Sequence, residues 1–295
     1  MKPIGLIIGE TASLPKEIIK KFQMIFVPFA TDWPEGKDLP GKDLFQKMRE
    51  GAKKGIKNFP KTSQPSIGNY KEAFEKALSK FEKTILITVS SKLSGAYNTA
   101  CFARRMLSQK MQERIEIIDS QTGSAGEGLL VFKTAQLIEK GKKGFNEIVL
   151  SIKQMIPEIH LFCMLEDPKW LEVGGRLSHP LAVLLRQMQK IGMRPLIGTK
   201  NGMIKPVSLK IKAKDVPTAL FKELKNETRK KLESGKKIIV AISHADNLKG
   251  AKRLQKMIEK RLNNTKIAFL SLVDPVIGVH SGPGTLLCAW TEEDL

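Results

Sequence analysis

Small hydroxyl side chains directly follow an apolar run in the first third of the chain. Residues 84–89 are apolar and β-branched, and the serine-rich residues 90–95 come next. A helical pattern begins at Ala96, so Ser94 and Gly95 lie between the carboxyl end of a predicted strand and the start of a predicted helix. Unpaired backbone N–H groups and the helix dipole make such a corner suited to anions. Helix capping explains the same residues, and the sequence leaves both roles open.

A second group of hydroxyls lies just before another predicted helix. Thr62 and Ser63 stand two and three residues after Pro60, and Ser66 is a good N-cap for the helix that follows. Capping by Ser66 does not use the hydroxyls of Thr62 and Ser63. A ligand-binding role for these two side chains therefore remains an alternative to a structural one.

Two further segments carry a cation or an imidazole beside glycines. Arg176 follows Gly174 and Gly175, where a guanidinium can form paired hydrogen bonds with a carboxylate or a phosphate. A surface ion pair is the other interpretation of Arg176. His280 and Ser281 precede Gly-Pro-Gly, and we expect them to lie in a tight loop near the end of the chain.

The motifs argue against several common chemistries. The serine corner lacks the glycine and lysine spacing of a phosphate-binding Walker loop. The four histidines have no spacing typical of metal ligands, and no G-x-S-x-G nucleophile motif occurs. We therefore expect no catalytic residues, no metal site and no cofactor.

The elements that must position these residues alternate between strand and helix in the first half. Apolar runs predict strands at 4–8, 24–28, 84–89 and 115–118, and periodic patterns predict helices at 15–22, 42–51, 68–81, 96–109, 125–139 and 145–156. Residues 29–40 are expected to form a loop. This alternation is typical of a parallel sheet, in which ligands bind beyond the carboxyl ends of the strands.

Pro157 marks a predicted domain boundary. Beyond it, strands are expected at 160–164, 194–199, 203–209, 238–243 and 267–272, and helices at 181–189, 216–233 and 248–262. Asn201 and Gly202 are typical of a hairpin turn. The predicted fold class is α/β, with an N-terminal parallel-sheet domain (1–157) and a C-terminal α+β domain (158–295). The ligand should lie in the cleft between them, to which the tail of the second domain returns.

The charge of the chain is strongly basic, with a formal net charge of +20 over 295 residues. Residues 205–265 hold 17 basic and 6 acidic side chains. A solvated lysine-rich face, a partner-docking face and a nucleic-acid-binding face all fit this excess. Aromatic residues make up only 6% of the chain, so stacking platforms for single strands are not expected.

Targeting and redox signals are few. No apolar run is long enough to span a membrane, and the chain passes directly into a predicted strand, so we expect neither a transmembrane segment nor a signal peptide. The three cysteines lie far apart, which favours a reducing cytoplasm and a packing role for each thiol.

The segments together, and in this order, resemble the DegV family of fatty-acid-binding proteins over essentially the whole chain. The segments that carry the resemblance are 62–66, 90–97, 118–120, 174–178 and 277–284. The resemblance implies a long-chain fatty acid, similar to palmitate or oleate, held between the two domains with its alkyl chain in an apolar tunnel. Some members present this acid to a separate fatty acid kinase.

The resemblance also implies roles for particular residues. Thr62 and Ser94 would contact the carboxylate, and Ser63 would lie close by. Arg176 and His280 would surround the carboxylate directly or through water. Matching of the segments adds Gly95 and Ser281 to the same expected ligand site.

Some segments depart from the family pattern. Gly9-Glu10 replaces an Asp-Ser pair after the first strand, and the loop from residue 29 to residue 42 is short. Lys210-Ile211-Lys212 stands where many members carry an arginine linked to kinase docking, and lysine lacks a bidentate fork. The sequence therefore predicts a fatty-acid carrier rather than a catalyst, with a kinase as a possible partner and no nucleic acid. A basic nucleic-acid-binding or regulatory module and a nucleotide-binding phosphotransferase are the alternatives.

Overall fold

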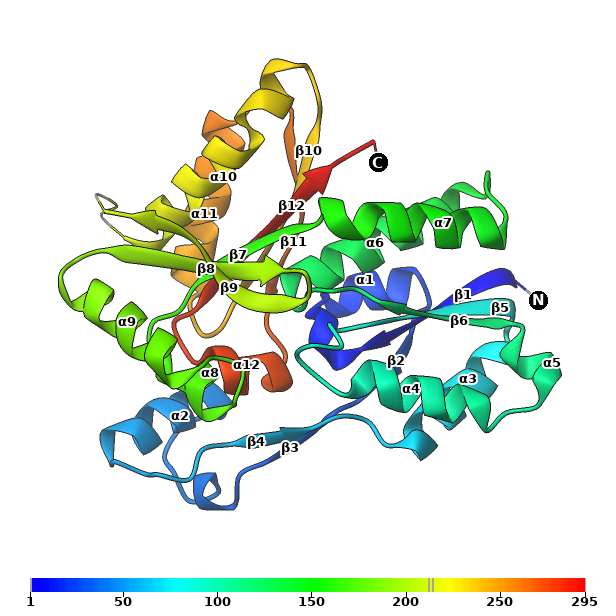
Figure 1. Ribbon diagram of the computed structural model, residues 1–295, viewed down its shortest axis with the longest axis horizontal. Helices are drawn as coiled ribbons and strands as arrows, with labels where there is room; N and C mark the ends of the chain where they lie inside the picture. The colour runs from blue at the N-terminus through cyan, green and yellow to red at the C-terminus, as the bar shows by residue number, and fades with distance from the viewer. Residues whose placement is uncertain (1, 212, 214, 295) are drawn as a thin grey trace.

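The strands of the first half and those of the second half form separate sheets (Figure 1). The computed structural model describes residues 2–211, 213 and 215–294. The first sheet has four parallel strands in the order β2 (Ile25–Val27), β1 (Lys2–Gly9), β5 (Phe81–Thr88) and β6 (Ile115–Asp119). The centre of β5 is fully buried, as its continuous apolar run predicts for a sheet covered on both faces.

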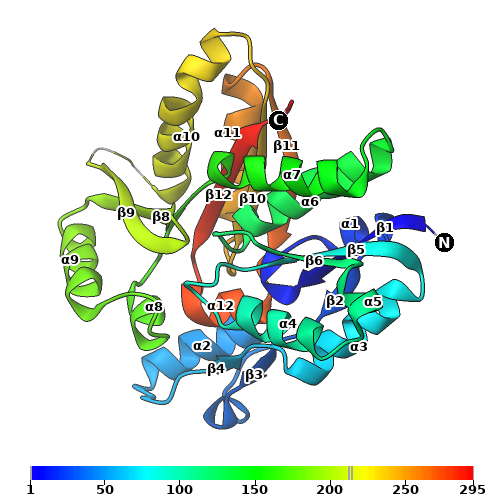
Figure 2. The same cartoon turned by 45° about the vertical axis from the view of Figure 1, so that its right-hand side comes forward.

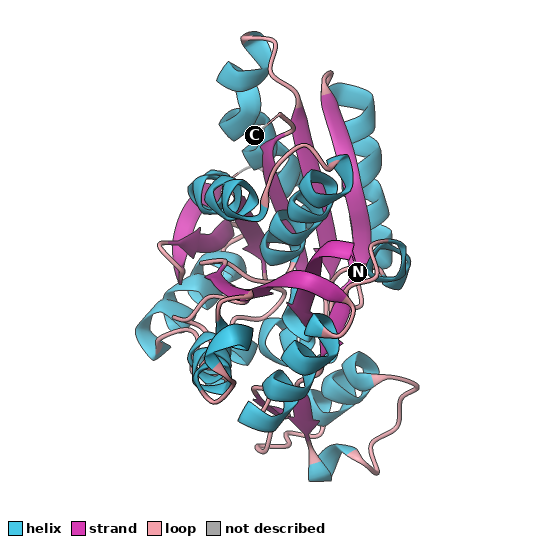
Figure 3. Ribbon diagram, turned by 90° about the vertical axis from the view of Figure 1, so that its right-hand side faces the viewer, coloured by secondary structure: helices cyan, strands magenta, loops and turns pink. Residues whose placement is uncertain are grey.

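Helices of the first half cover this sheet from both sides (Figure 3). They are α1 (Lys16–Lys21), α3 (Ile67–Leu78), α4 (Ala96–Arg105), α5 (Gln109–Gln112), α6 (Ala125–Lys140) and α7 (Phe145–Met155). Helix α2 (Leu44–Lys53) lies away from this sheet and packs against the second half of the chain, where its Arg49 pairs with Glu166 and Asp246 (Figure 1). Helices α3 and α4 pack on one face, and α6 packs on the other. Ser66 caps α3 in a reciprocal capping box with Asn69, so the structure gives Ser66 the capping role.

The second sheet has six strands of mixed direction. Their order is β11 (Thr265–Leu272), β10 (Ile238–His244), β12 (Leu286–Glu292), β7 (His160–Met164), β8 (Arg194–Lys200) and β9 (Met203–Lys210). Only the pair β10–β11 is parallel. Asn201 and Gly202, both with positive φ, form the predicted turn between β8 and β9.

The described residues of the second half form the helices α8 (Lys169–Val173), α9 (His179–Lys190), α10 (Val216–Glu233), α11 (Leu248–Arg261) and α12 (Pro275–Ser281). Helices α10 and α11 lie side by side over one face of the second sheet (Figure 2). Strand β7 alternates between two cores, because Phe162 and Met164 face these helices whereas Leu161 and Cys163 face the opposite side.

One apolar core joins the two sheets. It contains side chains of β1 and β5 from the first sheet, β7 and β10 from the second, and α6 between them. The strands change sheet near residue 157, but the core continues across that point. The domain bounds 1–157 and 158–295 therefore stay a prediction. Within the described residues, no helix is long and apolar enough to cross a membrane.

Two local predictions were wrong. The expected loop 29–40 contains a strand, β3 (Ala30–Asp32), which pairs with β4 (Lys61–Ser63) and runs beneath α12 (Figures 1 and 2). This pairing spans about 30 residues of chain, so no local pattern indicates it. His280 and Ser281 lie in α12 rather than in a loop, because buried Val276 and Val279 anchor a short helix that ends before Gly282 at φ 76°.

Candidate functional site

A cavity of about 370 Å³ lies between the two sheets. The loops that follow β1, β5 and β6 line one side of it, as expected for ligand sites at the carboxyl ends of parallel strands. Strand β4 and helix α12 close the polar end. Strands β7, β8 and β12 supply an apolar wall from the second sheet.

The structure brings most of the predicted site residues together at this cavity. Those that line it are Thr62, Ser63, Ser94, Arg176, His280 and Ser281. Gly95 does not line the cavity, and a Cβ atom there would lie 2.5 Å from the amide oxygen of Gln64. Gly95 thus allows Gln64, which does line the cavity, to approach the start of α4.

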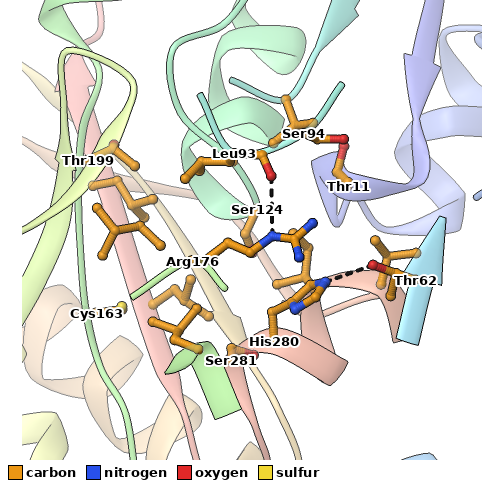
Figure 4. A pocket seen from close by; sticks show the side chains of 18 of the residues that line it. Thr11, Thr62, Leu93, Ser94, Ser124, Cys163, Arg176, Thr199, His280 and Ser281 are labelled. Carbon is orange, nitrogen blue, oxygen red and sulfur yellow. Dashed lines mark hydrogen bonds between the residues drawn. The ribbon is translucent and has the colours of Figure 1, made fainter. Parts of the chain in front are cut away.

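Thr62 and His280 form a hydrogen bond across the polar end. Thr62 Oγ1 lies 2.7 Å from His280 Nε2, joining β4 to α12 (Figure 4). Burial, and then the charge of Arg176, lower the pKa of His280 to about 4. The imidazole is therefore neutral at pH 7 and offers one donor and one acceptor nitrogen.

The second nitrogen of His280 is packed against backbone. Nδ1 is buried and has no hydrogen-bond partner among the described residues. A Cβ atom on Gly174 would lie only 2.3 Å from this nitrogen. Gly174 has an ordinary φ of −70°, so its lack of a side chain serves this close approach rather than the backbone conformation.

Arg176 brings a positive charge to the same end of the cavity. Its Nε donates to the Leu93 carbonyl oxygen at 3.3 Å (Figure 4). Its Nη1 donates to the Gly174 carbonyl oxygen. Burial lowers the pKa of the guanidinium. No described acidic side chain forms an ion pair with Arg176, which rules out the surface ion pair within the described ranges. Its remaining N–H groups are available to an anionic ligand.

The serine corner after β5 is only partly available to a ligand. Ser90 is buried and donates to the Gly202 carbonyl oxygen at 2.7 Å, which ties the β8–β9 turn to this loop. The Ser91 backbone N–H donates to Asp119. Ser94 lines the cavity and also accepts from the Ala96 backbone N–H at 3.3 Å, so its two roles coexist.

Four polar lining residues were not among the predicted site residues. Thr11 follows β1, Gln64 follows β4, Ser124 precedes α6, and Thr199 lies in β8. Gln64 belongs to the segment 62–66 that the sequence analysis did examine. Polar residues at strand ends were the available signal, but which of them face inward depends on the local backbone, such as φ 48° at Ser124.

The far side of the cavity is apolar. Leu161, Cys163 and Leu165 project from β7 and the residue after it, and Ile197 and Leu287 project from neighbouring strands. Burial raises the pKa of the Cys163 thiol to about 12, so it stays protonated and packs as a small apolar group. Polar donors at one end and a hydrocarbon wall at the other suit an amphiphile with an acidic head.

The basic segment lies apart from the cavity, on β9, α10 and α11, and several of its charges are paired. Lys210 forms an ion pair with buried Glu223, and Arg253 pairs with Asp215 at 2.7 Å. Lys210 is therefore engaged within the fold. Lys212 lies outside the described residues.

The comparisons with known proteins agree on one family. The family model described as "Uncharacterised protein, DegV family" matches residues 3–293. A DegV domain-containing protein of Clostridium acetobutylicum is 30% identical over 289 residues, covering 96% of each chain.

Two similar solved structures have the same fold. A DegV family protein from Thermus thermophilus, described with fatty-acid binding, has a TM-score of 0.82 at 20% identity and covers 98% of this chain and 99% of its own. A stearic-acid-binding protein from Eubacterium ventriosum has a TM-score of 0.82 at 20% identity, covering 98% of each chain. The polar-headed cavity between two sheets, the family model and these relatives lead to one conclusion: this chain belongs to the DegV family.

Proposed function

We propose that this protein binds one long-chain fatty acid, with the carboxylate at the polar end of the cavity and the alkyl chain along its apolar wall. The observation that carries the proposal is the guanidinium of Arg176, which lies in a largely apolar cavity without an acidic partner among the described residues. A half-buried cation without a counter-ion favours an anionic ligand. The fatty acids named with related structures support the same ligand class.

The size of the cavity supports a chain of this class. An engineered cavity of roughly 150 Å³ holds benzene, which corresponds to about 25 Å³ for each heavy atom. On that scale the cavity of about 370 Å³ holds about fifteen heavy atoms. Hexadecanoic acid is slightly larger, so its binding requires a modest outward movement of the lining.

The alkyl chain supplies most of the affinity in this proposal. About fourteen methylenes at roughly 0.8 kcal/mol each give about 11 kcal/mol before the costs of association and chain ordering. The polar end needs mainly to satisfy the carboxylate as it leaves water. Thr62, Ser94 and Arg176 are the donors that we assign to it, with His280 holding Thr62 in place.

We propose that the protein is a carrier rather than an enzyme, located in the cytoplasm. Its free cysteines fit a reducing compartment. Delivery of the bound acid to a separate fatty acid kinase is part of the proposal, supported by the family resemblance. Trapping of acyl-phosphate with hydroxylamine, after mixing the loaded protein with a kinase and ATP, tests this delivery.

The binding proposal has a direct test. Organic extraction of the purified protein followed by mass spectrometry should recover a fatty acid, and adding hexadecanoate to delipidated protein should raise its melting temperature. The double variant Thr62→Val/Ser94→Ala should fold but retain less fatty acid. Absence of any extracted acid, together with an unchanged melting temperature, would overturn the proposal.

A further inference from the structure

Behind the polar end of the cavity lies a carboxyl group that is entirely closed off from solvent. Glu127 projects from α6 and has no exposed surface. Its Oε1 is 3.0 Å from Thr11 Oγ1, and its Oε2 is buried without a hydrogen-bond partner in the described part of the chain. Thr11 itself lines the cavity, so its hydroxyl group connects Glu127 to the ligand space.

The surroundings of Glu127 contain acids but no balancing cation. The titratable groups that act on it are Asp274 at the start of α12 and Asp119 at the end of β6, and Glu127 in turn acts on the phenol of Tyr70 on α3. Strands β1, β5, β7, β10 and β12, against which α6 packs, contribute apolar side chains to the same core. On α6 itself, Lys133 turns away and donates to the carbonyl oxygen of Glu293.

These surroundings favour a protonated carboxyl group. Burial raises the pKa of Glu127 well above its usual value, the hydrogen bond from Thr11 opposes this, and Asp274 and Asp119 raise the pKa further. Asp274 is perturbed in the same direction by burial and by Glu10, with Lys16 opposing. Complete burial, an Oε2 without a partner in the described part of the chain and this upward shift of the pKa together favour the neutral carboxylic acid, which has a proton to donate.

The protonation of Glu127 decides what Thr11 can offer to the cavity. A threonine hydroxyl has one proton and two lone pairs. An ionised Glu127 would accept the proton of Thr11, leaving only lone pairs to face an anionic ligand. A neutral Glu127 can donate its own proton to Thr11 Oγ1, which frees the Thr11 proton for the ligand.

We propose that Glu127 is a positioning residue of the cavity: it donates its proton to Thr11 and so directs the Thr11 hydroxyl toward the carboxylate of the ligand. The inference rests on the proposed fatty-acid binding and adds that the affinity for the fatty acid depends on the protonation of Glu127. The acid binds as its anion, the proton stays on Glu127, and the affinity falls once rising pH ionises Glu127.

Infrared spectroscopy of delipidated protein tests the first step of the inference. The difference spectrum between the wild type and Glu127→Gln at pH 7 should contain the C=O stretch of a protonated carboxyl group. Adding hexadecanoate should shift that band in the wild type, because Thr11 stops donating to Glu127 and accepts the proton of Glu127 instead. In Thr11→Val the band should not shift. Absence of the band, or a band that ignores the ligand, would overturn the inference.

Binding curves between pH 6.5 and 9.5 test the linkage. Thr11→Val should bind hexadecanoate roughly tenfold more weakly at pH 7, and Thr11→Ser should restore the binding. If the wild-type band disappears as the pH rises through this range, the affinity for hexadecanoate should fall in parallel. Glu127→Gln should show no such fall, because its amide donates to Thr11 at every pH. A titrating band with constant affinity contradicts the linkage.

Glu227→Gln is the matched control. Burial also raises the pKa of Glu227, but this residue of α10 accepts from Nε1 of Trp290 on β12, away from the cavity. Its substitution should leave the pH profile of binding unchanged. If the wild type binds no hexadecanoate at any pH, the proposed function fails, whereas the ligand-free infrared band still reports separately on Glu127.

Discussion

Thr62 Oγ1 and His280 Nε2 lie 2.7 Å apart although 218 residues separate them in the sequence. The bond joins the short ribbon β3–β4 to helix α12 at the polar end of the cavity. Because His280 is neutral, its Nε2 can either donate to the Thr62 hydroxyl or accept from it. A ligand carboxylate therefore meets a fixed hydroxyl and a separate cation, Arg176.

Replacing Thr62 by valine should weaken fatty-acid binding at least tenfold, because a hydrogen bond to a charged group contributes about 1.5–3 kcal/mol. The fold should also lose about 1–3 kcal/mol, since His280 Nε2 would lose its partner. Thr62→Ser should keep most of the affinity and most of the stability. Displacement of a fluorescent fatty acid and urea unfolding measure the two effects, and equal affinity for the valine and serine variants would contradict the assignment.

Gly174→Ala should disturb His280 without straining the backbone. The new Cβ would lie about 2.3 Å from His280 Nδ1, which forces the imidazole to move and lengthens its bond to Thr62. We expect weaker binding together with reduced stability, measured by the same displacement and unfolding experiments. Unaltered affinity in this variant would show that the position of the imidazole is unimportant for the ligand.

The stability of the protein should fall in acid partly because of His280. Its pKa is about 4 in the folded protein and about 6.5 in the unfolded chain, so the unfolded state binds more protons between these values. The contribution is lost progressively from pH 6.5 to pH 4 and amounts to on the order of 3 kcal/mol. Urea unfolding of the wild type and His280→Gln at several pH values should show a shallower slope in the variant. Parallel curves for the two proteins would refute the prediction.

Asp274 should have the opposite pH dependence. Burial, and then the charge of Glu10, raise its pKa from 3.8 to about 7, so the folded state retains a proton that the unfolded chain has released. Stability should therefore fall as the pH rises from about 4 to about 7 and stay level above that. Asp274→Asn removes the titration and should be more stable than the wild type at pH 8, by as much as a few kcal/mol. Chemical unfolding at pH 5 and pH 8 measures the difference, which should be larger at pH 8.

Cys163 should set the length of the acyl chain that fits. It lines the apolar wall and is nearly buried, so Cys163→Phe fills part of the cavity and should shift preference toward shorter fatty acids. Cys163→Ala enlarges the same space and should shift preference toward longer ones. Competition among acids of different length, followed by extraction and mass spectrometry, measures both shifts. A common direction of change in the two variants would argue that the chain does not reach this wall.

Local sequence patterns were sufficient for the longer regular elements, but not for the short elements β3, β4, α8 and α12. The apolar run of β5, the Asn201-Gly202 turn and the long periodic pattern of α10 all predicted elements that the structure contains. Each rests on interactions between near neighbours in the chain: burial of alternate or continuous side chains, positive φ at a turn, and a repeating helical face. The order of the strands within the sheets was not available in this way, because it depends on contacts between distant segments.

The sequence by itself determined the kinds of side chain that surround the cavity, namely hydroxyls after strands, one arginine beside glycines and one histidine near the end of the chain. Only the tertiary structure decided which of them meet. It paired Thr62 with His280, turned Ser90 toward Gly202, left Gly95 outside the cavity and placed Thr11 between the ligand space and Glu127. The reason is physical: hydrogen bonding and pKa depend on distance and burial, which are set when the two sheets pack around a shared core.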